Sequence, residues 1–361
     1  MPVRTRKQTS AKKASSTSAS ADDSKSHEMA GPAQSKLEKM AVRVVAALAM
    51  ASVLASVIYF GQHLGVGIML TLVTVGIFNE LVNVAHKEAN ADREIPWFRT
   101  VLWLWFFVAA HITYTSDGLS YAPMNLTRTI AERLPYVGSE VARLLEFTKR
   151  YAALVSLWMY AAAFVATVLC LKKKHLATQL RILSFTVLAM STFMAQMKMA
   201  IHNTFAGLFW FLFPFVLVAV NDTFAYFSGF FLGRKVFGDR TFLTISPNKT
   251  WEGFIGGGLC TVVAGFYVPL LLNHRFLTCS FEAMEAAGES NECAPNPRVF
   301  GPASLFGEPT PEGSVLGVQY HGMCLAFFAS TVAPFGGFFA SAIKRAYGLK
   351  DFANWIPGHG E

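Results

Sequence analysis

The 361-residue chain is too apolar and too poor in charge to be an ordinary water-soluble domain. Hydrophobic residues make up 53% of it and charged residues only 15%, whereas soluble domains carry about 25% charged residues. The formal net charge of +8 lies largely in the N-terminal tail and at loop ends, as in cytoplasmic segments that face anionic lipids. These features exclude a soluble enzyme, indicate a lipid bilayer as the surroundings and argue against a nucleic-acid partner.

Residues 1–38 are rich in Ser, Ala, Lys and Thr and contain few large apolar residues. Such a composition predicts a disordered basic tail. The first twenty residues also have the basic, acid-free character of an organelle transit peptide, but Asp22 and Asp23 interrupt that bias. We therefore expect a cytosolic tail, followed by one transmembrane domain over residues 39–361.

The apolar stretches of this domain are long and do not alternate with polar residues. Several approach the roughly 20 residues that span a bilayer as a helix, whereas barrel strands would alternate apolar and polar residues. We expect an all-α, polytopic integral membrane protein with about eight to nine transmembrane helices. The predicted spans are 41–60, 64–85, 100–114, 150–171, 182–200, 204–220, 222–233, 254–273 and 318–340. The stretch 222–233 is too short to cross unaided.

Positive residues orient these spans. When the basic tail is placed inside, the "KKK" at 172–174 and the pair Lys344 and Arg345 come to the same side. The loop 274–316 then lies outside with Cys279 and Cys293, which can pair if the compartment is oxidising. Asn125, in an N-glycosylation sequon, falls on that outer side as well. The polar clusters described next therefore converge on the inner face.

The first cluster, "VNDTFAYFSGFFLGR" (220–234), directly follows a strongly apolar run and contains Asn221 and Asp222. An ionised carboxylate near the membrane interior needs a partner, and a metal ion is the obvious one. The alternative is an Asp that caps a helix at the interface. Gly229 and Gly233 permit close approach of another helix.

The second cluster, "SPNKTWEGFIGGG" (246–258), combines hydroxyl and amide donors with Lys249 and Glu252 ahead of a glycine-rich helix start. Donors, a Lys and a helix N-terminus together predict a phosphate-binding site, although the P-loop spacing is absent. Glu252 is expected to bind a metal or to orient Lys249. The alternative is a plain helix start with a small-residue packing face.

The third cluster, "SAIKRAYGLKDFANWIPGHGE" (341–361), ends the chain. Cations at a membrane boundary explain Lys344 and Arg345, but they do not explain Asp351 and His359 in a Pro/Gly turn. With the other clusters, this one supplies cations and carboxylates at one interface. Such a site suits a polyphosphate with Mg²⁺ meeting a lipid head group, and it predicts phosphoryl or nucleotidyl transfer.

These three ordered motifs resemble eukaryotic-type CDP-diacylglycerol synthase (phosphatidate cytidylyltransferase). The C-terminal signature of that family matches Ser341, Lys344, Arg345, Lys350, Asp351, Pro357, Gly358, His359 and Gly360. The resemblance implies that the substrates are CTP and phosphatidic acid, that the products are CDP-diacylglycerol and pyrophosphate, and that the cofactor is Mg²⁺. It also implies a homodimer in the endoplasmic reticulum membrane, although a mitochondrial or plastid membrane stays open.

The resemblance assigns roles to particular residues. The expected catalytic residues are Asp222, Lys249, Glu252, Lys344, Arg345, Lys350, Asp351 and His359. The expected substrate-binding residues are Asn221, Ser246, Asn248, Thr250, Trp251, Gly253 and Ser341. Asp222 and Asp351 are expected to bind the metal, with Glu252 as a further candidate.

The chain departs from the family pattern after Gly360, where the family continues with Gly, two residues and Asp-Arg-x-Asp, but this chain has only Glu361. We therefore expect that the domain lacks its C-terminal end and that the chain as written is inactive or severely impaired. One alternative is a non-catalytic membrane partner or regulator of a full-length enzyme. Others are a CTP-dependent lipid kinase and a transporter that uses Asp222, Glu80 and Lys198, although no convincing inverted repeat is present.

Overall fold

The computed structural model describes residues 36–89, 95–116, 140, 143–144, 146–147, 150–238, 242–243, 249–287, 293–304, 310 and 315–348. Nearly all of the described residues are helical. The long helices are α1 (Lys36–Ser56), α2 (Gln62–Ala89), α4 (Pro96–Ser116), α7 (Ala152–Cys170), α8 (Leu176–Ala206), α9 (Leu208–Leu232), α10 (Trp251–Leu272), α14 (Gly317–Thr331) and α15 (Ala333–Ala346). Short elements are η1 (Val57–Gly61), η3 (Lys173–His175), α11 (Arg275–Thr278), α12 (Phe281–Ala287), α13 (Pro297–Phe300), β1 (Pro302–Ala303) and β2 (Val315–Leu316).

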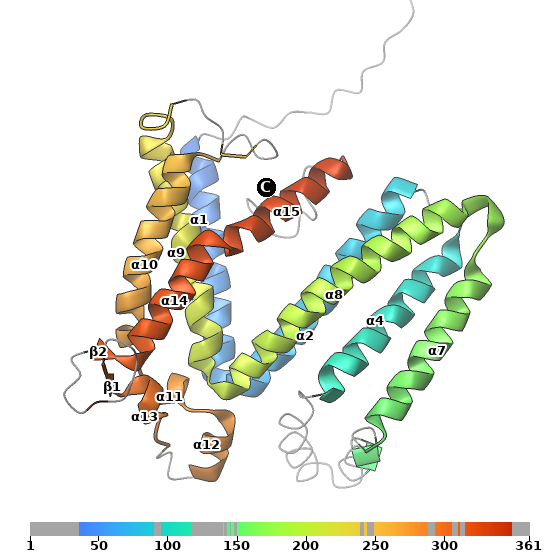
Figure 1. Ribbon diagram of the computed structural model, residues 1–361, viewed down its shortest axis with the longest axis horizontal. Helices are drawn as coiled ribbons and strands as arrows, with labels where there is room; N and C mark the ends of the chain where they lie inside the picture. Colours follow the sequence, from blue (N-terminus) through green and yellow to red (C-terminus); the bar gives the residue numbers. More distant parts are fainter. Residues whose placement is uncertain are drawn as a thin grey trace, which may run out of the picture.

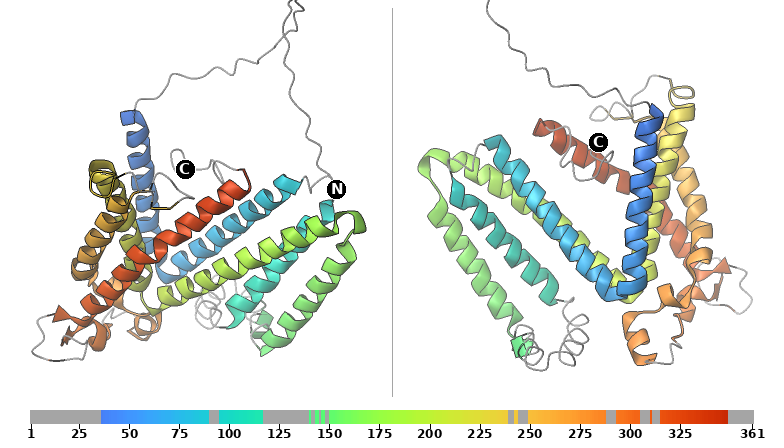
Figure 2. Two further views of the ribbon diagram at one scale, coloured as in Figure 1. Left: turned by 45° about the horizontal axis from the view of Figure 1, so that its top comes forward. Right: turned by 180° about the vertical axis from the view of Figure 1, so that it is seen from behind.

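The long helices form two groups that diverge from a common base (Figures 1 and 2). The first group contains α1, α9, α10 and α14, and the second contains α2, α4, α7 and α8. Two sharp turns at the base connect them: η1 leads from α1 to α2, and Gly207 separates α8 from α9. Gly207 has φ +146°, and an added Cβ would lie 3.3 Å from the carbonyl oxygens of Leu277 and Thr278, so this turn requires glycine.

The two groups are packed differently. In the second group, large side chains fill the core: Phe78 is fully buried, and its ring centroid lies 4.5 Å from that of Phe106 and 4.9 Å from that of Trp103. In the first group, α10 approaches its neighbours through glycines. A Cβ on Gly257 would lie 2.8 Å from the Cβ of Ala225 on α9, and one on Gly265 would lie 2.7 Å from the carbonyl oxygen of Gly322 on α14. This is the small-residue packing expected between helices in lipid.

The membrane-protein prediction is confirmed: six helical segments of the described chain are long and apolar enough to cross a bilayer. The predicted spans 41–60 and 64–85 overlap one continuous segment, Val45–His86, which bends at η1. The doubtful span 222–233 is the second half of α9, so it does not cross separately. The span predicted at 100–114 forms α4, which is helical but is not among the six segments.

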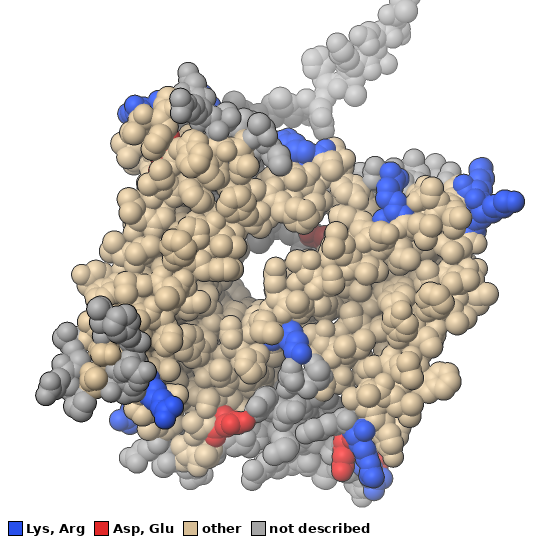
Figure 3. Space-filling model, viewed as in Figure 1, with Lys and Arg blue, Asp and Glu red and all other residues tan. Residues whose placement is uncertain are grey.

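The basic residues that were predicted to face the inner side of the membrane, where the structure describes them, lie at one end of the molecule. Lys172–Lys174, Lys249 and the C-terminal turn of α15 are all at the upper end in Figure 1, and Figure 3 shows basic side chains on that end. The opposite end carries α11 to α13, the two-stranded β1–β2 pair and a disulfide between Cys279 and Cys293. Residues 1–35 of the predicted tail and Asn125 lie outside the described residues, and Lys36 already begins α1.

Candidate active site

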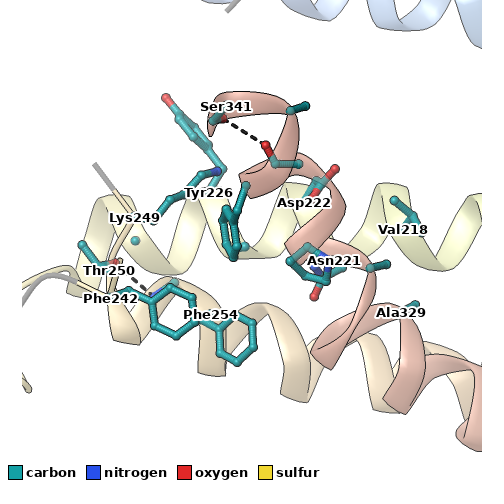
Figure 4. A pocket seen from close by; sticks show the side chains of 18 of the residues that line it. Val218, Asn221, Asp222, Tyr226, Phe242, Lys249, Thr250, Phe254, Ala329 and Ser341 are labelled. Atoms are coloured by element: carbon teal, nitrogen blue, oxygen red, sulfur yellow. Dashed lines mark hydrogen bonds between the residues drawn. The ribbon is translucent and has the colours of Figure 1, made fainter. Parts of the chain in front are cut away.

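A cavity of about 850 Å³ lies between α9, α10 and α15 (Figure 4). Lys249 and Lys344 are among the residues that line it. Its walls combine apolar surface with the few polar side chains that the sequence singled out. The lining residues include Val218, Asn221, Asp222, Tyr226, Phe230, Phe242, Lys249, Thr250, Gly253, Phe254, Ala333, Gly337, Ala340, Ser341 and Lys344.

The wall on α9 carries two consecutive polar residues with different surroundings. Asn221 is 5% exposed, and its Oδ1 lies 3.3 Å from the Thr261 hydroxyl of α10, within hydrogen-bonding distance. Asp222 is exposed and lines the cavity. Asn221 therefore stabilises the contact between α9 and α10, while Asp222 offers its carboxylate to a ligand.

The wall on α10 is the N-terminus of that helix. Thr250 is the N-cap, and its Oγ1 accepts a hydrogen bond of 3.2 Å from the backbone N–H of Gly253. The preceding residue, Lys249, lines the cavity and is close enough to Asp222 for their charges to interact. A helix N-terminus beside a Lys favours an anion. The predicted phosphate-binding segment thus faces the predicted carboxylate.

The third wall is formed by small residues on one side of α15: Ala333, Gly337, Ala340 and Ser341, with Lys344 one turn further on. The Ser341 hydroxyl donates to the carbonyl oxygen of Gly337 at 3.0 Å. α15 breaks away from α14 at Val332 and crosses toward the second helix group, where Tyr347 meets Phe185 of α8 with ring centroids 5.1 Å apart. The predicted single span 318–340 is therefore two helices: α15 forms most of this wall, and α14 reaches the cavity through Ala329.

Phe242 contributes to the site, although the sequence reasoning missed it. Its ring centroid lies 4.7 Å from that of Trp251, 4.6 Å from that of Phe254 and 5.8 Å from that of Phe338. It therefore joins the α9–α10 connection to both α10 and α15. A single aromatic residue in a connection belongs to no helical period, so no sequence signal distinguishes it.

A family model described as the cytidylyltransferase family matches residues 41–360. The chain belongs to the phosphatidate cytidylyltransferase family. It is 33% identical to phosphatidate cytidylyltransferase 1 of Arabidopsis thaliana over 91% of this chain and 75% of that protein. It is 34% identical to phosphatidate cytidylyltransferase 1 of Homo sapiens over 88% of this chain and 67% of that protein. It is 32% identical to a probable phosphatidate cytidylyltransferase of Dictyostelium discoideum over 91% of this chain and 67% of that protein.

The cavity contains some of the residues that were predicted to form the active site and lacks others. Glu80 and Lys198, which a transport pathway would use beside Asp222, do not line this cavity. Among the predicted site residues, the structure brings together Asn221, Asp222, Lys249, Thr250, Gly253, Ser341 and Lys344. Trp251 is exposed and packs on Phe242, and Arg345 is exposed on the last turn of α15. Ser246, Asn248, Lys350, Asp351 and His359 lie outside the described residues.

Glu252 does not line the cavity, although the sequence analysis counted it among the catalytic and metal-binding candidates. Its side chain is 5% exposed, and Oε1 accepts hydrogen bonds from the backbone N–H groups of Val236 at 3.1 Å and Phe237 at 2.9 Å. This carboxylate is directed toward the protein backbone. The arrangement favours a structural contribution at the start of α10.

The donor set of the cavity fits a magnesium ion that arrives with its nucleotide. Asp222 is the one carboxylate among the described lining residues, and within the described chain no three His, Cys, Asp or Glu side chains gather to hold a metal by themselves. Mg²⁺ commonly binds through one or two carboxylates together with substrate phosphates and water. Asp222 therefore suits a metal bound jointly with a polyphosphate.

Proposed function

We propose that this protein transfers the cytidylyl group of CTP to phosphatidic acid, forming CDP-diacylglycerol and pyrophosphate for phospholipid biosynthesis. The observation that carries the proposal is the juxtaposition of Asp222 with Lys249 in a cavity whose third wall is formed by small residues of α15, with Lys344 at its end. The relatives named phosphatidate cytidylyltransferase support the same reaction. A water-soluble nucleotide and a membrane lipid can meet in a cavity at the boundary of the bilayer.

The reaction forms one bond and breaks one. A phosphate oxygen of phosphatidic acid attacks the α-phosphorus of CTP, the bond from that phosphorus to the bridging oxygen of the β-phosphate breaks, and pyrophosphate leaves with the electron pair. Since little covalent chemistry falls to the protein, positioning and charge neutralisation account for most of the rate enhancement.

Residues of this chain perform those two tasks. Lys249, Lys344 and the N-terminus of α10 neutralise and orient the phosphates of the two substrates, and Thr250 keeps the first turn of α10 in place. Asp222 is the residue that would hold Mg²⁺, which supplies charge neutralisation on the phosphates when bound. Arg345, Lys350, Asp351 and His359 extend the same set by family resemblance, with Asp351 as the second metal candidate.

We further infer that the protein is a multi-pass component of the endoplasmic reticulum membrane and acts as a homodimer. The basic end, with Lys172–Lys174, Lys249 and Lys344, would face the cytosol, where CTP is available. The end that carries the Cys279–Cys293 disulfide would face the oxidising lumen. Family resemblance supports both the compartment and the dimer.

Product analysis tests the proposal. The gene product, purified from its complete reading frame and reconstituted in liposomes, is supplied with CTP, phosphatidic acid and Mg²⁺. We expect CDP-diacylglycerol and pyrophosphate in equal amounts. Release of CDP with a newly phosphorylated lipid would identify a CTP-dependent lipid kinase instead. No nucleotide turnover, together with stimulation of an active relative on mixing, would identify a non-catalytic partner.

A further inference from the structure

The carboxylate of Glu252 is buried at the junction between two helices. Among the described residues it is the one acidic side chain that is buried, with 5% of its surface exposed. It belongs to the first turn of α10, yet its Oε1 reaches across to the backbone N–H groups of Val236 and Phe237 in the connection that follows α9. A buried charge is costly unless hydrogen bonds compensate it. These two donors provide that compensation.

The connection that receives Glu252 has an unusual backbone. Arg234 has φ +63° and Gly238 has φ +66°, and a left-handed conformation at a residue other than glycine costs about 1 kcal/mol. Turns of this kind direct successive N–H groups into a concavity that binds an anion. In a nucleotide-binding site the expected anion would be a phosphate. Here the carboxylate of Glu252 accepts the hydrogen bonds of the N–H groups.

This contact connects the two elements that carry the charges of the cavity. Asp222 lies on α9, and the connection begins directly after Leu232, where that helix ends. Lys249 lies three residues before Glu252, immediately ahead of the α10 N-cap. The Glu252 hydrogen bonds therefore fix the end of α9 against the start of α10. They set where Lys249 lies relative to Asp222.

We propose that Glu252 is a positioning residue for cytidylyl transfer: it fills the N–H concavity at Val236 and Phe237 and thereby holds Lys249 opposite Asp222. Glu252 takes no part in binding Mg²⁺ under this proposal. The inference deepens the proposed function and rests on it. It also yields a structural signature that can be measured without any turnover.

The test uses the full-length protein in lipid nanodiscs with Glu252→Gln, Glu252→Ala and, as a matched control, the exposed acid Glu282→Ala. Hydrogen exchange is read at the amides of residues 234–238, and turnover is measured across a Mg²⁺ titration. Glu252→Ala should speed exchange at Val236 and Phe237 and lower kcat by about tenfold or more. Glu252→Gln, which keeps one acceptor oxygen, should give a smaller loss. All variants should keep the wild-type Mg²⁺ concentration for half-maximal activity, and Glu282→Ala should behave as wild type.

Three results would overturn the proposal. A large rise in the Mg²⁺ requirement of both Glu252 variants, with unchanged exchange, would make Glu252 a metal ligand. Faster exchange with undiminished kcat would show that the contact does not position the site. Unchanged exchange together with unchanged kcat in both variants would show that Glu252 has no role in positioning the site. If Glu252→Ala does not fold, Glu252→Gln carries the test, because it preserves the side-chain volume. If the wild type forms no CDP-diacylglycerol, the proposed function fails, while the exchange data still decide whether Glu252 fixes the connection.

Discussion

The two helix groups of this protein differ in how closely their helix backbones approach, although both bury aromatic rings, Phe78 in one and Phe209 and Phe213 in the other. The group of α2, α4, α7 and α8 is held by large side chains such as Phe78, whose ring stacks on that of Phe106. In the other group, α10 comes into close contact with α9 at Gly257 and with α14 at Gly265. The cavity and its charged residues lie beside the glycine-packed helices. Close backbone contact fixes the positions of these helices relative to one another. Substitutions at the contacts of this group should therefore be tolerated least well.

The largest expected effect on turnover comes from removing a cation that lines the cavity. Lys249→Ala should lower kcat/KM by about 100-fold or more, because a cation that neutralises phosphate in the transition state is lost. Lys173→Ala in η3 removes an exposed cation at the same end of the molecule but beside the other helix group. It should change kcat/KM by less than about twofold. Steady-state kinetics with CTP varied at saturating phosphatidic acid measures both, and equal losses would contradict the assignment.

A smaller effect is expected from a single methyl group between α9 and α10. A Cβ on Gly257 would lie 2.8 Å from the Cβ of Ala225 and 3.0 Å from the carbonyl oxygen of Asn221, so Gly257→Ala must push the helices apart. We expect destabilisation of about 1–3 kcal/mol and a loss of activity of roughly tenfold. Gly258→Ala is the matched control, since its Cβ meets Ser330 at an ordinary 3.6 Å. Thermal unfolding and turnover measurements should distinguish the two variants. Equal stability and equal activity would contradict the claim that the close contact between α9 and α10 matters.

The lipid side of the cavity should respond to bulk on α15. Gly337 lines the cavity, Gly336 does not, and a Cβ at either position meets nothing within 4 Å. Gly337→Leu should raise KM for long-chain phosphatidic acid by about threefold to tenfold while KM for CTP changes little, because the new side chain occupies cavity space. Gly336→Leu should leave both constants near the wild-type values. A larger change for CTP than for the lipid would place the nucleotide, not the acyl chains, along α15.

The smallest effect on turnover is expected in the second helix group, even though the cost in stability is substantial. Phe78→Ala removes a fully buried ring from between Trp103 and Phe106. Replacements of this kind cost about 3–5 kcal/mol. The kcat of the folded fraction should nevertheless stay within about twofold of the wild type. Thermal denaturation measures the loss of stability, and active-site titration gives kcat for the folded fraction. A larger fall in kcat would show that the second group also shapes the site.

The sequence predicted what local patterns encode. Long apolar runs determine where helices form in lipid, so the spans 150–171, 182–200 and 254–273 closely match α7, α8 and α10. The charge distribution likewise predicted that Lys172–Lys174 and the end of α15 lie at the same end of the molecule, although Figure 3 also shows basic side chains at the opposite end. Asp222 and Lys249 were identified because a carboxylate and a cation are conspicuous at the boundaries of apolar runs.

What the sequence did not predict depends on partners distant along the chain. Nothing within α10 indicates that Glu252 turns toward the N–H groups of Val236 and Phe237, since that contact depends on the left-handed turn at Arg234. The break at Val332 was missed although Pro334, in the first turn of α15, is a local signal for a new helix start. Phe242 gains its role only when α10 and α15 converge on it.

Photo-crosslinking would test most directly whether the site lies beside the glycine-packed helices. A phosphatidic acid analogue with a photoreactive acyl chain is activated in nanodiscs containing the full-length protein, and labelled peptides are mapped by mass spectrometry. Labelling that excess unlabelled phosphatidic acid suppresses should fall on α9 near Tyr226 and Phe230 and on α15 near Gly337. Suppressible labelling confined to α2, α4, α7 or α8 would contradict the account.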